Sequence, residues 1–296
     1  MKPVVLLLIA LFLAGCAAPR EVRRASPAPA PVAAAPSPEP VWPANAPPLY
    51  AESAIMIDAR TGEVLLQKNA DMRRVPASTQ KLLTALLITR RGNLDAPVTI
   101  MPEDTRVEPT KLGLRPGERY TRRALLESIM VKSSNDACAA LARDHSGTEA
   151  AFVENMNRAA SSLGARSSYF VNSHGLPAEQ YSTARDISRI AFLAYRDPVL
   201  RRMMQQRVVY FRHNTGRVTR LEATNKLLER SGAFNGMKTG YTFAAGRCLV
   251  ASGRLNGREV ILVQLGSRTK HIFDDAERVM AWSGGGYYGG TTYGTF

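Results

Sequence analysis

Two pairs of short apolar runs, each separated by turn-forming residues, stand near the two ends of the central part of the chain. Residues 54–57 and 64–66 flank an Asp-Ala-Arg-Thr-Gly stretch, which fits a hairpin by its turn chemistry. Residues 248–251 and 260–263 flank Asn256-Gly257, and Asn-Gly is the strongest short-range hairpin signal. The pattern therefore predicts two β-hairpins that are distant in the sequence.

The segment between these hairpins has mostly helical patterning. Residues 79–89 are largely apolar apart from Gln80 and Lys81, which predicts a buried helix. Further helices are expected at residues 124–131, 136–144, 149–163, 184–194 and 274–282. A hairpin, a run of helices, a second hairpin and a terminal helix predict an α+β fold, in which an antiparallel sheet is flanked by helices and carries an inserted all-α lobe.

The first residues have the pattern of an export signal. Lys2 gives a positive start, and the apolar run of residues 4–13 is too short for a bilayer span, which needs about 20 residues. Leu13-Ala14-Gly15-Cys16 resembles the lipobox of bacterial lipoproteins, in which cleavage before the cysteine frees a thiol for acylation. We therefore expect a lipoprotein signal peptide at residues 1–15 and lipid attachment at Cys16; the alternative is a plain signal peptide with an incidental cysteine.

Composition divides the remainder into three parts. Residues 16–48 are rich in Ala and Pro, which predicts an extended tether. Residues 49–283 carry the periodic patterning of one folded domain, and the Gly/Tyr/Thr-rich residues 284–296 are expected to be a flexible tail. The predicted location is the periplasm, anchored by lipid to a bacterial membrane. Ala17, where an acidic residue would signal retention in the inner membrane, favours the outer membrane.

Overall composition narrows the class of partner. The chain is 45% hydrophobic and 22% charged, as globular proteins are, with a formal net charge of +14. Because an exported protein rarely meets nucleic acid, anionic lipid head groups and cell-wall carboxylates are the expected neighbours, and no nucleic-acid partner is predicted. Cys138 and Cys248 lie in apolar surroundings, which predicts buried free thiols.

Three short motifs carry the candidate chemistry: Ser78-Thr79-Gln80-Lys81, Ser133-Ser134-Asn135 and Lys238-Thr239-Gly240. Together they resemble the Ser-x-x-Lys, Ser-Asp-Asn and Lys-Thr-Gly set of penicillin-binding proteins and class A β-lactamases. Each motif alone is weak, because Ser and Asn are also good helix caps. A second Ser-x-x-Lys, at residues 267–270, shows that this motif also arises by chance.

Local context separates the two Ser-x-x-Lys copies. Ser78 opens an apolar helix, where backbone N–H groups favour developing negative charge. Lys81 lies one turn further along the same face, and desolvation there would lower its pKa enough for it to accept the serine proton. Ser267 instead follows a strand and precedes a polar stretch, so we expect it in a turn, with a solvated and protonated Lys270.

The other two motifs suggest the remaining roles. Ser133 is a candidate proton relay between Lys81 and the leaving amine, and Asn135 can donate to and accept from a substrate backbone. The third motif precedes the last hairpin and is expected on a strand edge. There Lys238 and Thr239 could bind a substrate carboxylate, and Gly240 would let the substrate lie close.

The combination is similar to the D-alanyl-D-alanine carboxypeptidases, the low-molecular-mass penicillin-binding proteins. The resemblance covers residues 53–282 and includes the stretches 76–85, 172–176, 182–186, 224–228 and 236–242. It implies the penicillin-binding, β-lactamase-like transpeptidase fold and acylation of Ser78 by a peptidoglycan pentapeptide that ends in D-Ala-D-Ala. The Ser78 and Tyr241 N–H groups would form the oxyanion hole. β-Lactams would acylate the same serine, and no cofactor is implied.

Alternatives remain. A D,D-endopeptidase acting on cross-linked muropeptides would use the same motifs, and so would a β-lactamase, although no Glu-x-x-Leu-Asn lies between Asn135 and Lys238. A wall-binding lipoprotein without turnover is the non-enzyme alternative. No metal is expected, because no ligand-like spacing relates His145, His174, His213 and His271. A Ser-His-Asp hydrolase would need a Gly-x-Ser-x-Gly elbow, which the sequence lacks.

Overall fold

The structure is a computed structural model that describes residues 42–268 and 270–284. The predicted signal peptide (residues 1–15), the lipid site Cys16, most of the predicted tether (residues 16–48) and nearly all of the predicted tail (residues 284–296) lie outside these residues. Among the residues described, no helix is both long and apolar enough to cross a bilayer.

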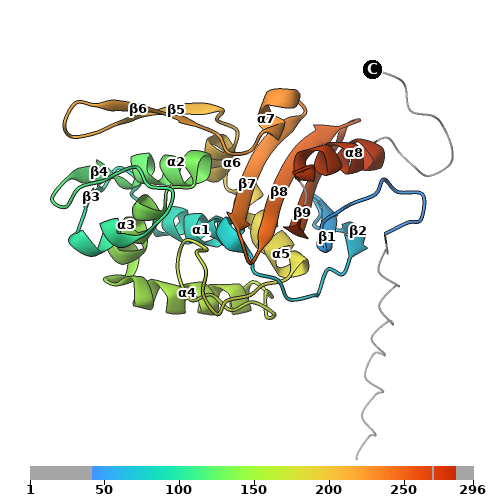
Figure 1. The fold of residues 1–296 in the computed structure, drawn as a ribbon, viewed down its shortest axis with the longest axis horizontal. Coiled ribbons are helices and arrows are strands. Elements are labelled where there is room, and N and C mark those ends of the chain that lie inside the picture. Colours follow the sequence, from blue (N-terminus) through green and yellow to red (C-terminus); the bar gives the residue numbers. More distant parts are fainter. Residues whose placement is uncertain (1–41, 269, 285–296) are drawn as a thin grey trace, which may run out of the picture. The chain divides into compact units, whose positions relative to one another are not determined.

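A five-stranded antiparallel sheet is the centre of the domain (Figure 1). Its order is β2-β1-β9-β8-β7, so β7 and β2 are the two edge strands. Both predicted hairpins are present, and they meet where β1 pairs with β9. The strands are β1 Ser53–Asp58, β2 Val64–Lys68, β7 Phe234–Thr242, β8 Gly246–Leu255 and β9 Arg258–Ser267.

Apolar side chains on both faces of the sheet make two separate cores. In β1, Ile55 and Ile57 belong to the larger core under the helices, whereas Ala54 and Met56 belong to a smaller core under the C-terminal helix. This division follows from the alternation of side chains along a strand. Trp42, within the segment assigned from sequence to the tether, packs against the smaller core.

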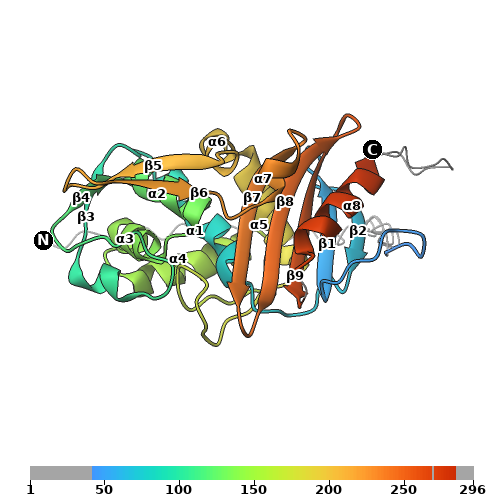
Figure 2. The same cartoon turned by 45° about the horizontal axis from the view of Figure 1, so that its top comes forward.

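Helices cover both faces of the sheet. The terminal helix α8 (Ile272–Gly284) packs on β8 and β9 from one side, and α5 (Ala184–Arg196) packs on β1 and β9 (Figure 2). Beyond the β7 edge lies a helical lobe that contains α2, α3 and α4 (Figures 1 and 2). The helices, including two 3₁₀ turns η1 and η2, are η1 Ala77–Gln80, α1 Lys81–Arg91, η2 Pro102–Arg106, α2 Arg122–Lys132, α3 Asn135–Ser146, α4 Glu149–Ser162, α6 Pro198–Met204 and α7 Leu227–Arg230.

The observed architecture confirms the predicted α+β fold, with small differences. The helix expected from residue 79 begins at Lys81, because Ala77–Gln80 forms a 3₁₀ turn. The sequence reading missed two short hairpins, β3 Pro97–Thr99 with β4 Arg119–Thr121 and β5 Val208–Arg212 with β6 Val218–Glu222. It also wrongly placed Ser267 in a turn. Ser267 is fully buried as the last residue of β9, because it continues the strand's pairing with β8.

Candidate active site

Ser78 lies in a tight turn that two other backbone segments press against. Ala77, directly before it, has φ of +48°, a conformation unusual for a residue with a side chain. A Cβ added to Gly240 of β7 would lie 2.9 Å from the Ser78 nitrogen, and one added to Gly175 would lie 2.1 Å from the Ala77 carbonyl oxygen. Both positions therefore need glycine for close approach. For Gly240 the crowding partner is the nucleophile itself, whereas the sequence reading expected substrate.

Lys81 is fully buried at the start of α1, with its amine turned toward Ser78. Its Nζ lies 2.9 Å from Ser78 Oγ, 2.7 Å from Asn135 Oδ1 and 2.5 Å from the His174 carbonyl oxygen. Burial lowers the pKa of Lys81 from 10.5 to about 8. A substantial fraction of the amine is then neutral near pH 8 and can accept the proton of Ser78 Oγ.

Lys238 and Ser133 form a second buried pair beside the first. Lys238 Nζ donates to Ser133 Oγ at 2.9 Å and to the Thr239 carbonyl oxygen at 2.9 Å. Burial, and then the neighbouring Lys81 charge, hold the pKa of Lys238 well below its usual value. Ser133 is thus hydrogen-bonded to Lys238, whereas the sequence reading placed it next to Lys81. Lys238 is 1% exposed, so a substrate carboxylate would contact the neighbouring hydroxyl groups, with the Lys238 amine behind them.

Hydroxyl groups line the same end of the site. Thr239 Oγ1 donates to Thr224 Oγ1 at 2.6 Å, and the Thr224 backbone nitrogen donates to the Val131 carbonyl at 3.1 Å. Ser133 caps the C-terminus of α2 with a left-handed φ of +69°, which turns the chain sharply before α3. Thr224 therefore belongs to the site, although the sequence indicated it only as part of the stretch 224–228.

Asn135 links Lys81 to the loop that follows η2. Its Oδ1 accepts from Lys81, its Nδ2 donates to the Pro109 carbonyl at 2.5 Å, and its backbone nitrogen donates to the Thr110 carbonyl at 2.8 Å. The amide oxygen expected to face substrate is therefore already used by Lys81. One Nδ2 hydrogen remains for a substrate carbonyl.

Asp136, the next residue, is buried and was missed from sequence. Its carboxylate accepts from the backbone nitrogens of Leu112, Gly113 and Leu114 at 3.0 to 3.2 Å. Asn135 and Asp136 together hold this loop against the site. From sequence, Asp136 is interpreted as an acidic residue in the first turn of a helix. No sequence pattern indicates its contact with residues 112–114.

The loop of residues 172–176 supplies an unexpected acceptor. Its His174 carbonyl accepts from Lys81 Nζ and, at 3.2 Å, from Ser78 Oγ. Asn172 Oδ1 accepts from the Gly175 nitrogen at 2.7 Å, and Glu149 Oε1 accepts from the Ser173 nitrogen at 3.0 Å. The loop is thus held in place from two sides. The His174 ring also takes part in the loop, since its Nδ1 accepts from the Leu176 nitrogen at 3.3 Å, but its contribution to the site is a backbone atom.

The two remaining thiols are buried and free, as predicted. Burial raises the pKa of both Cys138 and Cys248 to about 11, so both are neutral thiols at neutral pH. Burial also lowers the pKa of His174 to about 4, and its imidazole is therefore neutral as well.

Comparisons with known proteins agree with this geometry. The family described as D-alanyl-D-alanine carboxypeptidase, peptidase S11, matches residues 41–269. D-alanyl-D-alanine carboxypeptidase DacF of Bacillus subtilis is 35% identical over 227 residues, which are 74% of this chain and 58% of the relative. A D-alanyl-D-alanine endopeptidase of Pseudomonas aeruginosa is 31% identical over 79% of this chain and 77% of its own length. The chain therefore spans less than two thirds of DacF.

A solved structure extends the likeness to three dimensions. The crystal structure of a D-alanyl-D-alanine carboxypeptidase from Mycobacterium tuberculosis H37Rv superposes with a TM-score of 0.77 at 30% identity. The match covers 81% of this chain and 94% of that one. The fold is therefore that of the penicillin-binding D,D-peptidases.

Proposed function

Because the chain belongs to the D-alanyl-D-alanine carboxypeptidase family of peptidase S11, we propose that it is a serine D,D-carboxypeptidase that removes the terminal D-Ala from peptidoglycan pentapeptides. The observation that carries this proposal is the 2.9 Å contact between Lys81 Nζ and Ser78 Oγ, made by a fully buried lysine whose pKa is lowered to about 8. An amine in that state is a base matched to a serine nucleophile.

Acylation begins when the neutral Lys81 amine takes the proton of Ser78 Oγ. The oxygen attacks the carbonyl of the penultimate D-Ala, and the resulting oxyanion lies between the N–H groups of Ser78 and Tyr241. Ser133, hydrogen-bonded to Lys238, passes its proton to the leaving amine as the C–N bond breaks. The proton that Lys81 took replaces the one that Ser133 donated, so Lys81 is neutral again. Free D-Ala departs and leaves an ester on Ser78. Lys81 then accepts a proton from water as the water oxygen attacks the ester, and it returns that proton to Ser78 Oγ as the C–O bond breaks.

The substrate would bind as an extra strand. β7 is an edge of the sheet, so it offers backbone groups to an extended peptide. The terminal carboxylate would lie at the hydroxyls of Ser133 and Thr239, with Lys238 behind them as the charge that favours an anion. The scissile carbonyl would then lie next to Tyr241 and Gly240, of which Gly240 adjoins the Ser78 nitrogen.

Labelled penicillin tests this function. Incubation of the purified protein with it should give an adduct that peptide mass spectrometry maps to Ser78, because the β-lactam amide mimics the scissile dipeptide. The Ser78→Ala variant should give none. Rapid, repeated hydrolysis of a chromogenic cephalosporin would instead identify a β-lactamase, and labelling at another residue would overturn the proposal.

D,D-endopeptidase activity is the second candidate. It is favoured by the Pseudomonas aeruginosa endopeptidase, of which the chain covers a larger share than it does of DacF. Monomeric pentapeptide and cross-linked muropeptide dimer, supplied separately, distinguish the two activities. Preferential cleavage of the dimer would identify the endopeptidase.

For location, we propose that the mature protein is anchored in the periplasm through acylated Cys16, with the outer membrane as its site. The support is the lipobox-like Leu13-Ala14-Gly15-Cys16 and the following Ala17. Metabolic labelling with a fatty acid should mark the wild-type protein and not a Cys16→Ser variant. Equal labelling of both would contradict the anchor.

A further inference from the structure

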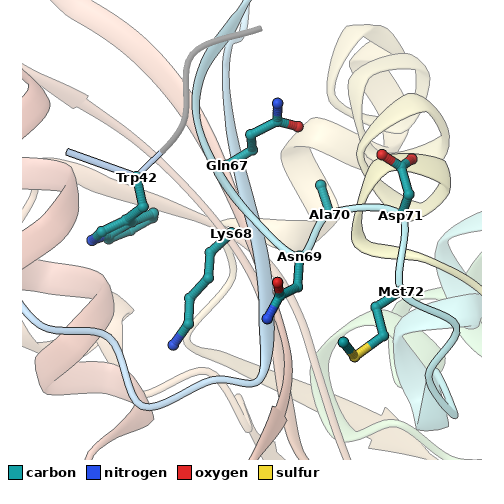
Figure 3. A pocket seen from close by; sticks show the side chains of 7 residues that line it. All are labelled: Trp42, Gln67, Lys68, Asn69, Ala70, Asp71 and Met72. Atoms are coloured by element: carbon teal, nitrogen blue, oxygen red, sulfur yellow. The ribbon is translucent and has the colours of Figure 1, made fainter.

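One hollow in the domain is lined by residues that lie outside the Ser78 site. It lies at the β2 edge and has a volume of about 490 Å³, within the range of ligand pockets (Figure 3). Trp42 stands on one side and the segment after β2 on the other, with Lys68 between them. The side chains that line it are Trp42, Gln67, Lys68, Asn69, Asp71 and Met72.

The lining combines one aromatic ring with amide, carboxylate and ammonium groups. Trp42 is held by its Nε1 donating to the Pro47 carbonyl at 3.3 Å, and Lys68 Nζ donates to the Leu49 and Ala51 carbonyls. These anchors keep the wall in place without a ligand. An indole face suits the C–H face of a sugar ring, and the surrounding polar groups suit its hydroxyl and acetamido groups.

A second hollow adjoins the first. Its volume is about 510 Å³, and Trp42 and Lys68 line both. The two volumes exceed what one sugar ring would fill, and the same two side chains line both. This size suits a glycan chain better than a monosaccharide.

Sheet topology places the hollow at the same end of the sheet as the nucleophile. β7 and β9 end there, β1 begins there, and Lys68 closes β2 opposite Ala54. Ser78 is six positions after Met72, so their Cα atoms are at most about 22 Å apart. The four stem-peptide residues up to the scissile bond span roughly 13 Å of this distance when extended. The disaccharide that carries the stem peptide adds its own length beyond the peptide, in the direction of the hollow.

A continuous row of contacts joins the two sites. From the end of β7, the Phe243 carbonyl accepts from Arg268 at 3.2 Å, and Arg268 lies 3.6 Å from Glu52. Glu52 also pairs with Arg74, whose Nη2 contacts the Met72 sulfur at 2.8 Å. A stem peptide paired antiparallel to β7, with its C-terminus at Thr239, leaves the site past Tyr241 toward this row.

We propose that the hollow at Trp42 binds the N-acetylated disaccharide of the peptidoglycan strand whose stem peptide occupies Ser78. The proposal rests on the D,D-peptidase function for its substrate, and it assigns the glycan a binding site of its own. The enzyme would then distinguish wall-attached or disaccharide-linked stem peptides from free peptides.

Kinetics with two matched substrates test the assignment in the full-length protein. The KM for a disaccharide-pentapeptide should be about tenfold lower than that for the free pentapeptide of the same sequence, as expected for one aromatic anchor. Trp42→Ala should abolish this difference without changing the KM for the free pentapeptide. Tyr210→Ala removes another exposed aromatic, on β5, and should retain the difference.

A second variant and a binding measurement complete the test. Met72→Ala changes an exposed side chain and should reduce the preference roughly twofold to threefold. Calorimetry measures binding of the peptide-free disaccharide without turnover. The Ser78→Ala variant should bind it as the wild type does, because the hollow does not include Ser78. This measurement therefore separates failure of this inference from failure of the peptidase function. Equal KM values in the wild type, or absence of disaccharide binding, would overturn the proposal.

Discussion

The chain contains the pattern Ser-x-x-Lys twice, and the two copies lie in opposite surroundings. Ser78 and Lys81 span the junction of a 3₁₀ turn and an apolar helix, where the lysine is fully buried with three polar partners. Ser267 is the last residue of β9 and is buried, whereas Lys270 follows the strand and is exposed. Only the first copy has a reachable hydroxyl beside a desolvated amine.

The difference shows that burial of the lysine, more than the spacing, makes the pair reactive. Desolvation disfavours the ammonium form, whereas a lysine in water keeps its proton. At Lys81 the surroundings contain hydroxyl, amide and carbonyl oxygens but no carboxylate among its hydrogen-bond partners. The amine is therefore positioned without an ion pair that would hold it protonated.

The largest expected effect comes from removing one lysine or the other. Lys81→Ala should slow penicillin acylation of Ser78 by about 10²- to 10⁴-fold, the usual contribution of a positioned general base. Lys270→Ala should leave the rate unchanged, because that side chain is exposed. Stopped-flow measurement of the acylation rates tests this prediction. Similar losses in both variants would show that the two Ser-x-x-Lys copies do not differ in this way.

The pH dependence of acylation sharpens the comparison. The base must be neutral, and burial places the pKa of Lys81 at about 8. Well below that value the neutral fraction falls tenfold per pH unit, so the rate should drop about 50-fold from pH 8 to pH 6 and level off above about pH 9. A rate that is constant from pH 6 to 9 would contradict this role.

A methyl group beside the nucleophile should have a smaller effect. Gly240→Ala places a Cβ 2.9 Å from the Ser78 nitrogen, which displaces either β7 or the nucleophile. We expect acylation to slow by about tenfold or more, since small displacements of reacting groups are costly. Gly232→Ala is the matched control, because nothing lies within 4 Å of its added Cβ. Acylation by Gly240→Ala at the wild-type rate would show that the close approach is unimportant.

The smallest effect concerns stability. The folded-state pKa of Lys81 lies below its unfolded value, so the buried charge destabilises the fold below about pH 8, and the penalty disappears as the pH rises toward 10.5. Lys81→Met should therefore stabilise the protein at pH 7 by roughly 1–3 kcal/mol. Lys270→Met should not. Thermal melts at pH 7 and pH 10 measure this, and a stabilisation that does not shrink at pH 10 would argue against the charge as its cause.

Sequence patterning predicted the sheet, most helices and the side chains that lie together around Ser78, because those features depend on residue type and spacing. It could not give the His174 carbonyl, since any residue offers the same backbone atom. It also missed Asp136, whose three partners lie more than twenty residues away in the chain. The pairing of Ser133 with Lys238 was likewise hidden, because it depends on how the sheet edge meets the helical lobe.

Within the residues described, the sheet ends in two strands, β2 and β7, that pair on one side only. Such strands can template a further strand from another molecule, which makes them sites of self-association. β2 has five residues, whereas β7 has nine, and β7 is the strand along which the substrate is proposed to bind. The unpaired edge of β7 that would bind substrate is thus also an edge through which two copies of the chain could associate. A ligand seated along β7 should keep concentrated solutions dispersed.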